Sequence, residues 1–555
     1  MNIAKAFANN DVVLLVWSYE DPIANCLGFC IKRTNVITNK IEVLTSMVGF
    51  SKSSIQTRQF KPTIIWPIQK FNWRDFTATS GQTYIYSIIP MIGEYDDLIE
   101  KKAIKLDSNE VTLSPGNDKI KAFFNKGILA TQYLSSQVPK SASGIPNYRI
   151  LQDRIKQAGD QLRNKLADDL RIAVMSTLQR AIDEDGKCYC ALYELNDQEL
   201  LAKLLEAGDR VHLILSNTGQ DDGTNETSRA SLQDSSVNLI NRMVGSGHIG
   251  HNKFIVYVTK SGTPSIVMTG STNWTHTGLC AQSNNAILIQ SRTIAKQYYN
   301  YWHRLKDDNA AQSTEFRASN NQALKSRVDG SKISLWFSPN TKQKNKTATS
   351  AIPKDMEEVF TLMNNAKKSI LFLAFQPGSP SIIDEAAKIQ LLKPDLFIRG
   401  AATDNDAIGS SAISLYHRGI NDPVFVGVAE LKDDFSYWMA EILKSSPYAK
   451  AVIHEKVMVI DAFTPDCVVI TGSHNLGYRA SYNNDENLLI IKHHQQLATC
   501  YATHILDIYD HYRWRYFVNK NSGQSTFTGL NKKDSWQAPY FNNKRGESID
   551  KRFWL

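Results

Sequence analysis

The feature that most constrains the fold of this chain is a short polar pattern that occurs twice. Each copy has a histidine and a lysine two residues apart, and each is followed by Gly-Ser-x-Asn. The members are His251, Lys253, Ser271 and Asn273 in the first copy and His454, Lys456, Ser473 and Asn475 in the second. Histidine and serine are separated by 20 residues in the first copy and by 19 in the second. A pattern repeated at one spacing indicates two copies of one structural unit.

The sequence around both copies alternates strand and helix signals in the same order. In the first copy we expect strands at 188–195, 211–215, 253–258, 265–269 and 286–290, and helices at 196–208, 235–244 and 294–305. In the second we expect strands at 370–375, 396–399, 424–428, 457–460, 467–471 and 488–491, and helices at 381–391, 435–443 and 497–517. Strands that alternate with helices indicate α/β layers. The predicted fold class is therefore a mixed α/β chain with two tandem repeats related by pseudo-two-fold symmetry.

The first 115 residues carry a different signal. Short runs rich in β-branched and aromatic residues are separated by turn residues, and Tyr84, Tyr86 and Ile88 share one face at a period of two. We expect an all-β sandwich domain at 1–115. The stretches 71–76 and 81–84 weakly resemble fibronectin type III or immunoglobulin-like modules. The remaining expected units are a connecting segment at 116–186 with one long amphipathic helix at 148–182, the first repeat at 187–306, a polar linker at 307–331, the second repeat at 332–518 and a tail at 519–555.

The residue types of the repeated pattern point to phosphate chemistry. Residues two apart on a strand project to the same side, so each histidine is expected beside its lysine. Two facing copies place two imidazoles, two ammonium groups and several neutral hydrogen-bond donors around one pocket. Lysines attract a phosphate, hydroxyls and amides bind its oxygens, and two imidazoles can divide nucleophilic and acid roles. This donor set lacks the carboxylate cluster of a metal-dependent phosphodiesterase, so we expect no metal and no cofactor.

The duplicated pattern resembles the phospholipase D superfamily, whose HxKxxxxD signature occurs twice per active site with Gly-Ser-x-Asn downstream. The resemblance covers about 187–517, and it implies a phosphodiesterase that forms a phosphohistidine intermediate. It implies catalytic roles for His251, Lys253, His454, Lys456, Asn273, Asn475 and Glu486, substrate binding by Ser271, Ser473 and Asn284, and structural support by Asp461. An inactive chain that only binds phosphate is the alternative to catalysis.

The two copies differ in their acidic residues. Asp461 completes the second signature, whereas Val258 occupies the equivalent place in the first. Glu486 stands thirteen residues after Ser473, and an amide, Asn284, stands thirteen after Ser271. We expect Glu486 to pair with His454. A carboxylate favours the protonated imidazole, so His454 is predicted to be the general acid and His251 the nucleophile. The competing interpretation is that the carboxylate makes its histidine the stronger nucleophile.

Composition narrows the substrate without deciding it. The chain has 555 residues and a formal net charge of +8, which suits an anionic partner. We expect a nuclease acting on nucleic-acid phosphodiesters. The alternative is a phospholipase D or phosphatidyl transferase acting on phospholipid headgroups, and the second alternative is an inactive phosphate-binding scaffold that recruits a protein through the β-domain. No apolar run reaches the length of a membrane span, and seven scattered cysteines indicate reduced thiols, so a cytoplasmic location is expected.

Overall fold

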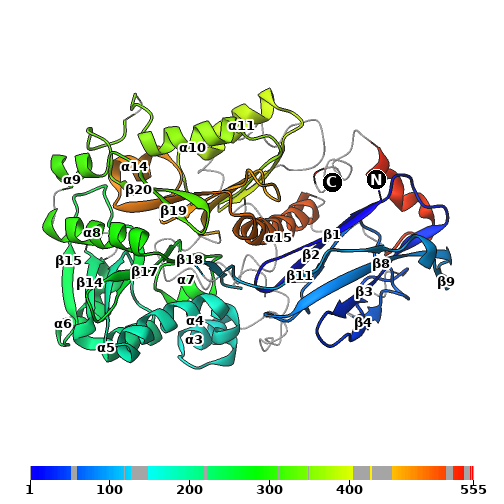
Figure 1. Cartoon of the computed structure of the whole chain (residues 1–555), viewed down its shortest axis with the longest axis horizontal. Coiled ribbons are helices and arrows are strands. Elements are labelled where there is room, and N and C mark those ends of the chain that lie inside the picture. Colours follow the sequence, from blue (N-terminus) through cyan, green and yellow to red (C-terminus); the bar gives the residue numbers. More distant parts are fainter. Residues whose placement is uncertain are drawn as a thin grey trace.

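The computed structural model describes most of the chain (Figure 1). The described residues are 2–51, 59–117, 119–126, 148–217, 222–308, 312–347, 349–403, 425–427, 453–520, 529–542, 551 and 553. Together they confirm the predicted fold class, because two mixed α/β units follow an all-β region.

Each repeat is built on one mixed sheet, and the two sheets follow the same strand order. The described strands of the first sheet run in the order β12 (Ile120–Phe124), β18 (Asn285–Gln290), β17 (Pro264–Gly270), β16 (Lys253–Val258), β13 (Lys187–Leu192), β14 (Val211–Ser216) and β15 (Asn238–Arg242). Those of the second run in the order β19 (Leu324–Val328), β20 (Ser331–Ser338), β26 (Glu486–Lys492), β25 (Val468–Gly472), β24 (Lys456–Ile460), β21 (Ser369–Ala374), β22 (Phe397–Ala402) and β23 (Phe425–Gly427). In the first sheet, β13 pairs in parallel with β14 and antiparallel with β16, the strand that follows His251. In the second sheet, β21 pairs in parallel with β22 and antiparallel with β24, the strand that follows His454.

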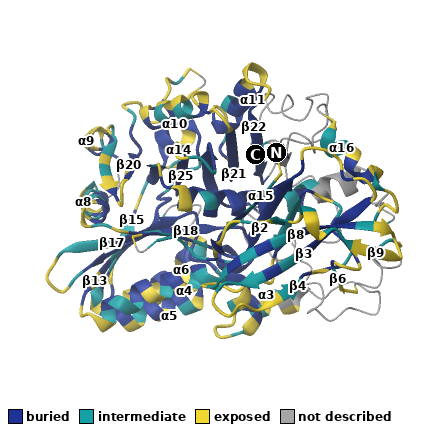
Figure 2. Ribbon diagram, turned by 45° about the vertical axis from the view of Figure 1, so that its right-hand side comes forward, coloured by how far each residue is buried: buried dark blue, intermediate teal, exposed yellow. Residues whose placement is uncertain are grey.

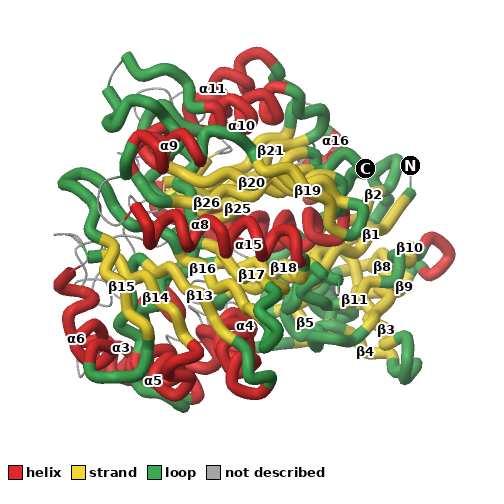
Figure 3. Tube along the Cα trace, turned by 60° about the vertical axis from the view of Figure 1, so that its left-hand side comes forward, coloured by secondary structure: helices red, strands yellow, loops and turns green. Residues whose placement is uncertain are grey.

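Two helices lie between the sheets, and other helices cover the outer faces (Figures 1 and 3). The inner helices are α8 (Arg292–Asp308) and α15 (Gln495–Lys520). The outer helices are α3 (Tyr148–Lys156), α4 (Gln161–Asp183), α5 (Gln198–Ala207), α6 (Asp222–Gln233) and α7 (His276–Cys280) on the first repeat, and α10 (Lys354–Asn364), α11 (Ile382–Leu392) and α14 (Tyr478–Asn483) on the second. One apolar core runs through both repeats, so the two sheets form a single body around α8 and α15.

The N-terminal region is a β-sandwich. One sheet contains β1 (Ile3–Ala8), β2 (Val13–Ser18) and β7 (Asn72–Asp75); the other contains β10 (Leu106–Asp107), β8 (Thr83–Glu94), β3 (Cys26–Asn35) and β4 (Ile41–Val43), with β9 (Asp97–Glu100) and β11 (Val111–Thr112) paired to β8. A further pair, β5 (Thr45–Ser46) and β6 (Lys61–Pro62), lies beside them. Strand β2 is buried throughout because its two faces enter different cores. Leu15 and Trp17 belong to the core of the sandwich, whereas Leu14 and Val16 belong to the core of the repeats. Figure 2 colours the strands by burial, and every residue of β2 is buried.

Several expected elements differ from the observed ones. The helix predicted at 148–182 is two helices, because Gly159 adopts a φ of 81° and Asp160 caps a new start by accepting from the Leu162 and Arg163 backbone N–H groups. The helix predicted at 235–244 is wrong, since that region forms β15, and a helix that was not predicted, α6, precedes it. The helix expected at 435–443 lies outside the described residues.

The boundaries of the repeats also extend beyond their expected ranges. Strand β12, from the predicted connecting segment, pairs with β18 and so completes the first sheet. The predicted linker contains α9 (Thr314–Ser319) and β19, which pairs with β20 at the edge of the second sheet. The sequence analysis did not predict α9 and β19 because their sequences are mainly polar, and each of them has one exposed face.

The C-terminal segment returns to the β-sandwich. The 3-10 turn Asp534–Gln537 and helix α16 (Ala538–Phe541) lie against it, and the Trp536 indole N–H donates to the Cys26 carbonyl at 2.8 Å. Trp536 belongs to the sandwich core and stacks near Phe71. All seven cysteines are buried and free, as the sequence predicts.

Candidate active site

The two histidines stand at the starts of equivalent central strands. His251 lies just before β16 and His454 just before β24, and each strand begins with the lysine of the pattern. The Lys253 Nζ folds back to donate to the His251 carbonyl at 2.8 Å, and Lys456 makes the same contact with His454. The two-residue spacing therefore serves both the common direction of the side chains and a local hydrogen bond. All four side chains are buried.

The Gly-Ser-x-Asn segments follow β17 and β25, where two backbone segments approach closely. A Cβ atom at Gly270 would lie 2.2 Å from the Asn285 carbonyl oxygen, and one at Gly472 would lie 2.3 Å from that of Asn487. Only glycine fits at these positions. The following serines use their hydroxyls inside the protein: Ser271 donates to the Asn284 Oδ1 at 2.8 Å, and Ser473 accepts from the Asn487 backbone N–H at 3.0 Å.

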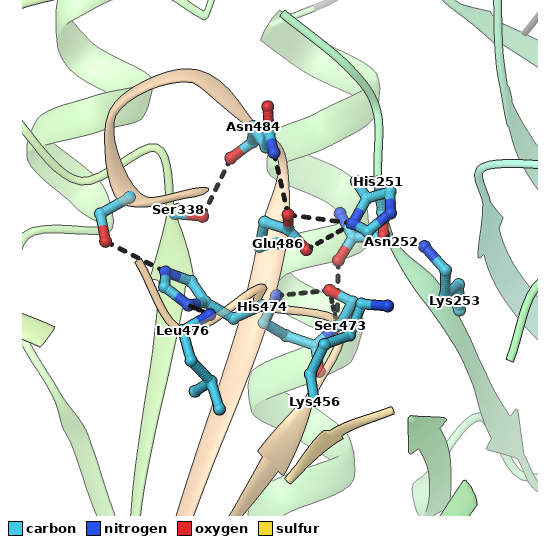
Figure 4. A network of polar contacts seen from close by, with 12 residues as sticks. His251, Asn252, Lys253, Ser338, Lys456, Ser473, His474, Leu476, Asn484 and Glu486 are labelled. Carbon is cyan, nitrogen blue, oxygen red and sulfur yellow. Dashed lines mark hydrogen bonds and ion pairs between the residues drawn. The ribbon is translucent and has the colours of Figure 1, made fainter. Parts of the chain in front are cut away.

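Each histidine receives its partner from the other repeat, which corrects the predicted pairing. The His251 Nδ1 lies 2.9 Å from both carboxylate oxygens of Glu486, and the His454 Nδ1 lies 3.0 Å from the Asn284 Oδ1. The expected pair between Glu486 and His454 is wrong. Asn284 directly precedes β18 and Glu486 begins β26. The two sheets face each other, so each of these residues meets the histidine of the other repeat. Figure 4 shows Glu486 between His251 and Asn484, whose side-chain N–H donates to it at 3.0 Å.

The contacts of Asn284 determine which nitrogen of His454 carries the proton. The Asn284 Nδ2 donates to the Gly278 carbonyl at 2.8 Å, which leaves its Oδ1 to accept from Ser271 and from His454. The His454 Nδ1 is then the protonated nitrogen, and Glu486 requires the same of His251. In the neutral form of either ring, the lone pair is on Nε2.

Both histidines line one cavity of about 160 Å³. Its lining is mainly polar, and it consists of Tyr193, Glu194, Ile249, His251, Asn273, Thr275, Thr277, Gln282, Phe375, Gln376, Pro377, His454, Asn475, Arg479, Ala480 and Asn484. Within the described chain this lining includes the predicted residues Asn273 and Asn475 but neither Ser271 nor Ser473. The serines lie behind the cavity, where they hold Asn284 and Asn487.

Sequence reasoning missed a pair of aromatic residues beneath the two His-Lys units. Tyr193 follows β13 and Phe375 follows β21, so they occupy equivalent places in the two repeats. The Lys253 Nζ lies 5.0 Å from the Tyr193 ring centroid, and the Lys456 Nζ lies 4.6 Å from that of Phe375. An aromatic face at this distance attracts an ammonium group. The sequence contained this signal as an aromatic residue at equivalent places in the two repeats, directly after β13 and directly after β21.

A carboxylate that the sequence analysis did not single out also faces the cavity. Glu194 accepts a short hydrogen bond from the Asn273 side-chain N–H, which orients that amide. Asp461 lies further away and has a local contact: its carboxylate accepts from the backbone N–H groups of Lys367, Lys368 and Ser369 at 2.6–3.1 Å. These contacts tie the turn after β24 to the start of β21.

Burial dominates the protonation of the site. It lowers the pKa of both histidines well below the usual value, and the neighbouring lysines lower it further. Burial lowers the pKa of Lys253 to about 7 and raises the pKa of Glu486 to about 7. The pKa of Lys456 is also lowered, first by burial and then by Lys253. A site that disfavours its own cations in this way is suited to an anion, whose charge restores their protonated forms.

The fold and the site together define a class of protein. Two facing α/β repeats bring paired His, Lys and Asn side chains together, which is the arrangement that the duplicated sequence pattern predicted. The family model described as "Cardiolipin synthase, PLD-like domain" matches residues 176–306 and 359–507, which is half of the chain. The chain belongs to this phospholipase D-like family.

Solved structures that match parts of this chain come from several organisms. A phospholipase D family member, Nuc from Salmonella typhimurium, is 19% identical, with 25% of this chain and 87% of that chain covered and a TM-score of 0.22. Phosphatidylserine synthase from Haemophilus influenzae is 12% identical, with 70% and 90% covered and a TM-score of 0.39. The yeast tyrosyl-DNA phosphodiesterase is 11% identical, with 57% and 86% covered and a TM-score of 0.31. No curated protein sequence matches the chain.

Two searches of the described residues concern membranes and metals. None of the described helices combines the length and the hydropathy needed to cross a bilayer. Among the same residues, no group of three or more His, Cys, Asp and Glu side chains is arranged to hold a metal ion.

Proposed function

We propose that this chain is a metal-independent nuclease that hydrolyses nucleic-acid phosphodiesters through a phosphohistidine intermediate. The observation that carries the proposal is that two buried histidines line one polar cavity, with a carboxylate on one and an amide on the other. Each histidine has its buried lysine beside it. That asymmetry gives the two imidazoles different chemistry.

His251 is the nucleophile in this proposal, on a different argument from the one the sequence suggested. When its Nε2 forms a bond to phosphorus, the imidazole keeps its Nδ1 proton and becomes a cation. The Glu486 carboxylate, 2.9 Å from that nitrogen, stabilises the cation. His454 has an amide partner instead of a carboxylate, which leaves its protonated form more acidic and therefore better able to release a proton.

The proposed reaction proceeds in two steps. The His251 Nε2 attacks phosphorus as the bond to the leaving oxygen breaks, and protonated His454 gives its Nε2 proton to that oxygen. Neutral His454 then takes a proton from water as the water oxygen attacks phosphorus, and the bond from phosphorus to His251 breaks. Two inversions give net retention. Four groups around the phosphate stabilise the charge that develops on its oxygens, namely Lys253, Lys456, Asn273 and Asn475.

The surroundings of the cavity support a nucleic acid over a lipid. In the part of the chain that the structure describes, no large exposed hydrophobic side chain lines the cavity, whereas the exposed Arg479 does. Acyl chains need an apolar surface next to the headgroup, but a sugar-phosphate backbone needs cations. The net charge of +8 agrees with the second requirement.

The test compares wild type with His251→Ala and His454→Ala in excess EDTA. The substrates are bis(p-nitrophenyl) phosphate, labelled DNA and RNA oligonucleotides, and vesicles of phosphatidylglycerol or phosphatidylcholine. We expect oligonucleotide cleavage that both substitutions abolish. Headgroup release or exchange with intact oligonucleotides would overturn the nuclease in favour of a phospholipase or phosphatidyl transferase. A lack of activity on all substrates would favour an inactive phosphate-binding scaffold.

A further inference from the structure

The loop between β20 and α10 carries an alternating run of lysines beside the active site. Residues 339–347, here called the lysine loop, include Lys342, Lys344 and Lys346, each separated by one polar residue. Lys342 and Lys344 are exposed. Neither ammonium group has an ion pair or hydrogen bond with another described residue, so both remain available to an external anion.

The backbone of this loop is held in place by a buried arginine. Arg317, on α9, is only 2% exposed. Its guanidinium donates to backbone carbonyls of the loop and of α14, namely those of Tyr482 at 2.9 Å, Lys344 at 3.3 Å, and Thr341 and Gln343 at 3.4 Å. An arginine fork that binds several carbonyls restrains their positions. The lysine loop is therefore fixed against α14.

A histidine of the first repeat adds a second restraint. The His248 Nδ1 lies 2.7 Å from the Asn483 carbonyl oxygen, and its Nε2 lies 2.8 Å from the Asn345 Oδ1. The loop is thereby connected to the chain segment that leads into the His251 motif. A displacement of the loop would disturb both repeats.

The lysine loop meets the rim of the cavity. Arg479, which lines the cavity, and Asn483 are one turn apart on the same face of α14. The Lys346 backbone N–H donates to the Asn483 Oδ1 at 3.3 Å, and its Nζ donates to the Ser379 carbonyl at 2.5 Å. Ser379 is two residues from Pro377, which also lines the cavity. Cationic groups thus continue from the cavity onto the outer surface.

We infer that the lysine loop and Arg479 bind the backbone of a single strand of nucleic acid that leads into the cavity. This inference rests on the proposed function and specifies its substrate. His251 and His454 are 2% and 3% exposed, so the scissile phosphate must enter a recess. A flexible single strand can place one phosphate there, whereas a paired duplex holds its phosphates on the outside of a wide cylinder. Regularly spaced exposed cations are the backbone-binding element of single-strand sites.

The experiment uses the full chain with Lys342→Ala/Lys344→Ala. The control, Lys102→Ala/Lys260→Ala, makes the same change in net charge at two exposed lysines of other regions. Affinity for a labelled single-stranded oligonucleotide is measured by fluorescence anisotropy in EDTA at several salt concentrations, in the His251→Asn background. We expect the slope of log affinity against log salt to fall by about 1.4, or about 0.7 for each lost phosphate contact. The control should keep the wild-type slope.

Turnover separates this inference from the proposed function. In the active background, the kcat/KM for the oligonucleotide divided by that for bis(p-nitrophenyl) phosphate should fall in the loop variant and not in the control. An unchanged slope and ratio overturn the inference, as does a duplex that binds and is cleaved as well as the single strand. Loss of vesicle binding without loss of oligonucleotide binding also overturns it. Hydrolysis of bis(p-nitrophenyl) phosphate that requires both histidines would still support a phosphodiesterase in each of these cases.

Discussion

Glu486→Gln tests the asymmetry on which the mechanism depends. The substitution keeps the size of the side chain and its ability to accept from His251, but it removes the negative charge 2.9 Å from Nδ1. The nucleophilic step creates a cationic imidazole at that place. The variant should therefore lose stabilisation of the intermediate and of the transition state that leads to it, while substrate binding changes little.

The size of the effect follows from the geometry. Two unit charges about 4 Å apart attract each other by about 4 kcal/mol at an effective dielectric constant of about 20. A hydrogen bond to a charged group contributes about 1.5–3 kcal/mol. A loss of about 3 kcal/mol corresponds to about a 150-fold lower kcat. Burial raises the pKa of Glu486 to about 7 and lowers that of Lys253 to about 7, so near pH 7 wild-type activity combines a gain from the ionising carboxylate with a loss from the deprotonating lysine. Glu486→Gln should lack the gain and keep the loss.

The assay is stopped-flow hydrolysis of bis(p-nitrophenyl) phosphate from pH 5 to 9, with alkaline quenching to preserve phosphohistidine for mass spectrometry. Glu455→Gln is the matched control. It makes the same change on a buried carboxylate that contacts His504 and Ser283 instead of a catalytic imidazole. The reasoning is refuted if Glu486→Gln stays within about threefold of wild type, or if the trapped phosphoryl group is on His454.

Three further substitutions test other parts of the site. Asn284→Asp places a carboxylate 3.0 Å from the His454 Nδ1, which raises the pKa of His454 and makes this histidine a weaker acid. The kcat should therefore fall more for alkyl diesters than for p-nitrophenyl diesters, whose leaving group needs no proton. Lys456→Met should reduce kcat at least about 100-fold, because it removes a cation that stabilises the phosphate charge. It should also raise the apparent melting temperature in a thermal-shift assay, because that cation is buried and crowded by Lys253. A lower melting temperature would contradict this. Asp461→Asn should cost about 1–2 kcal/mol in urea titration with kcat/KM within about threefold, since its carboxylate only holds backbone N–H groups.

The parts of the site that could be predicted from the sequence are those that depend on local strand geometry. The spacing of His251 and Lys253, and of His454 and Lys456, indicated a common direction from two strands. The structure places both histidines in the lining of one cavity, and each lysine donates to the carbonyl of its histidine. The repeated order of strand and helix signals also predicted two similar sheets. Both inferences need only the period of a strand and the fact of repetition.

The partners of the histidines could not be predicted in this way. Spacing places Glu486 thirteen residues after Ser473, which is the same for a contact within one repeat and for a contact across the pseudo-two-fold axis. Only the relative placement of the two sheets decides between them. Glu194 was missed for a similar reason, because it gains its role from Asn273, far away in the sequence.

The errors in the outer elements have local causes. The apolar period from Ile155 to Leu178 continues across Gly159, so periodicity alone could not show the break. Strand β15 lies at a sheet edge, and its alternation is weak, with only Arg242 buried. At such places tertiary contacts outweigh intrinsic preference.

The packing of Trp536 in the β-sandwich has a consequence for the order of folding. The strands of this domain precede both repeats in the chain, whereas the indole that completes their core follows them. During synthesis the core of the sandwich therefore stays incomplete, with an apolar face exposed near Phe29 and Phe71, until both repeats have been translated. Nascent chains that end before Trp536 should be more exposed to chaperones and proteases than the finished protein.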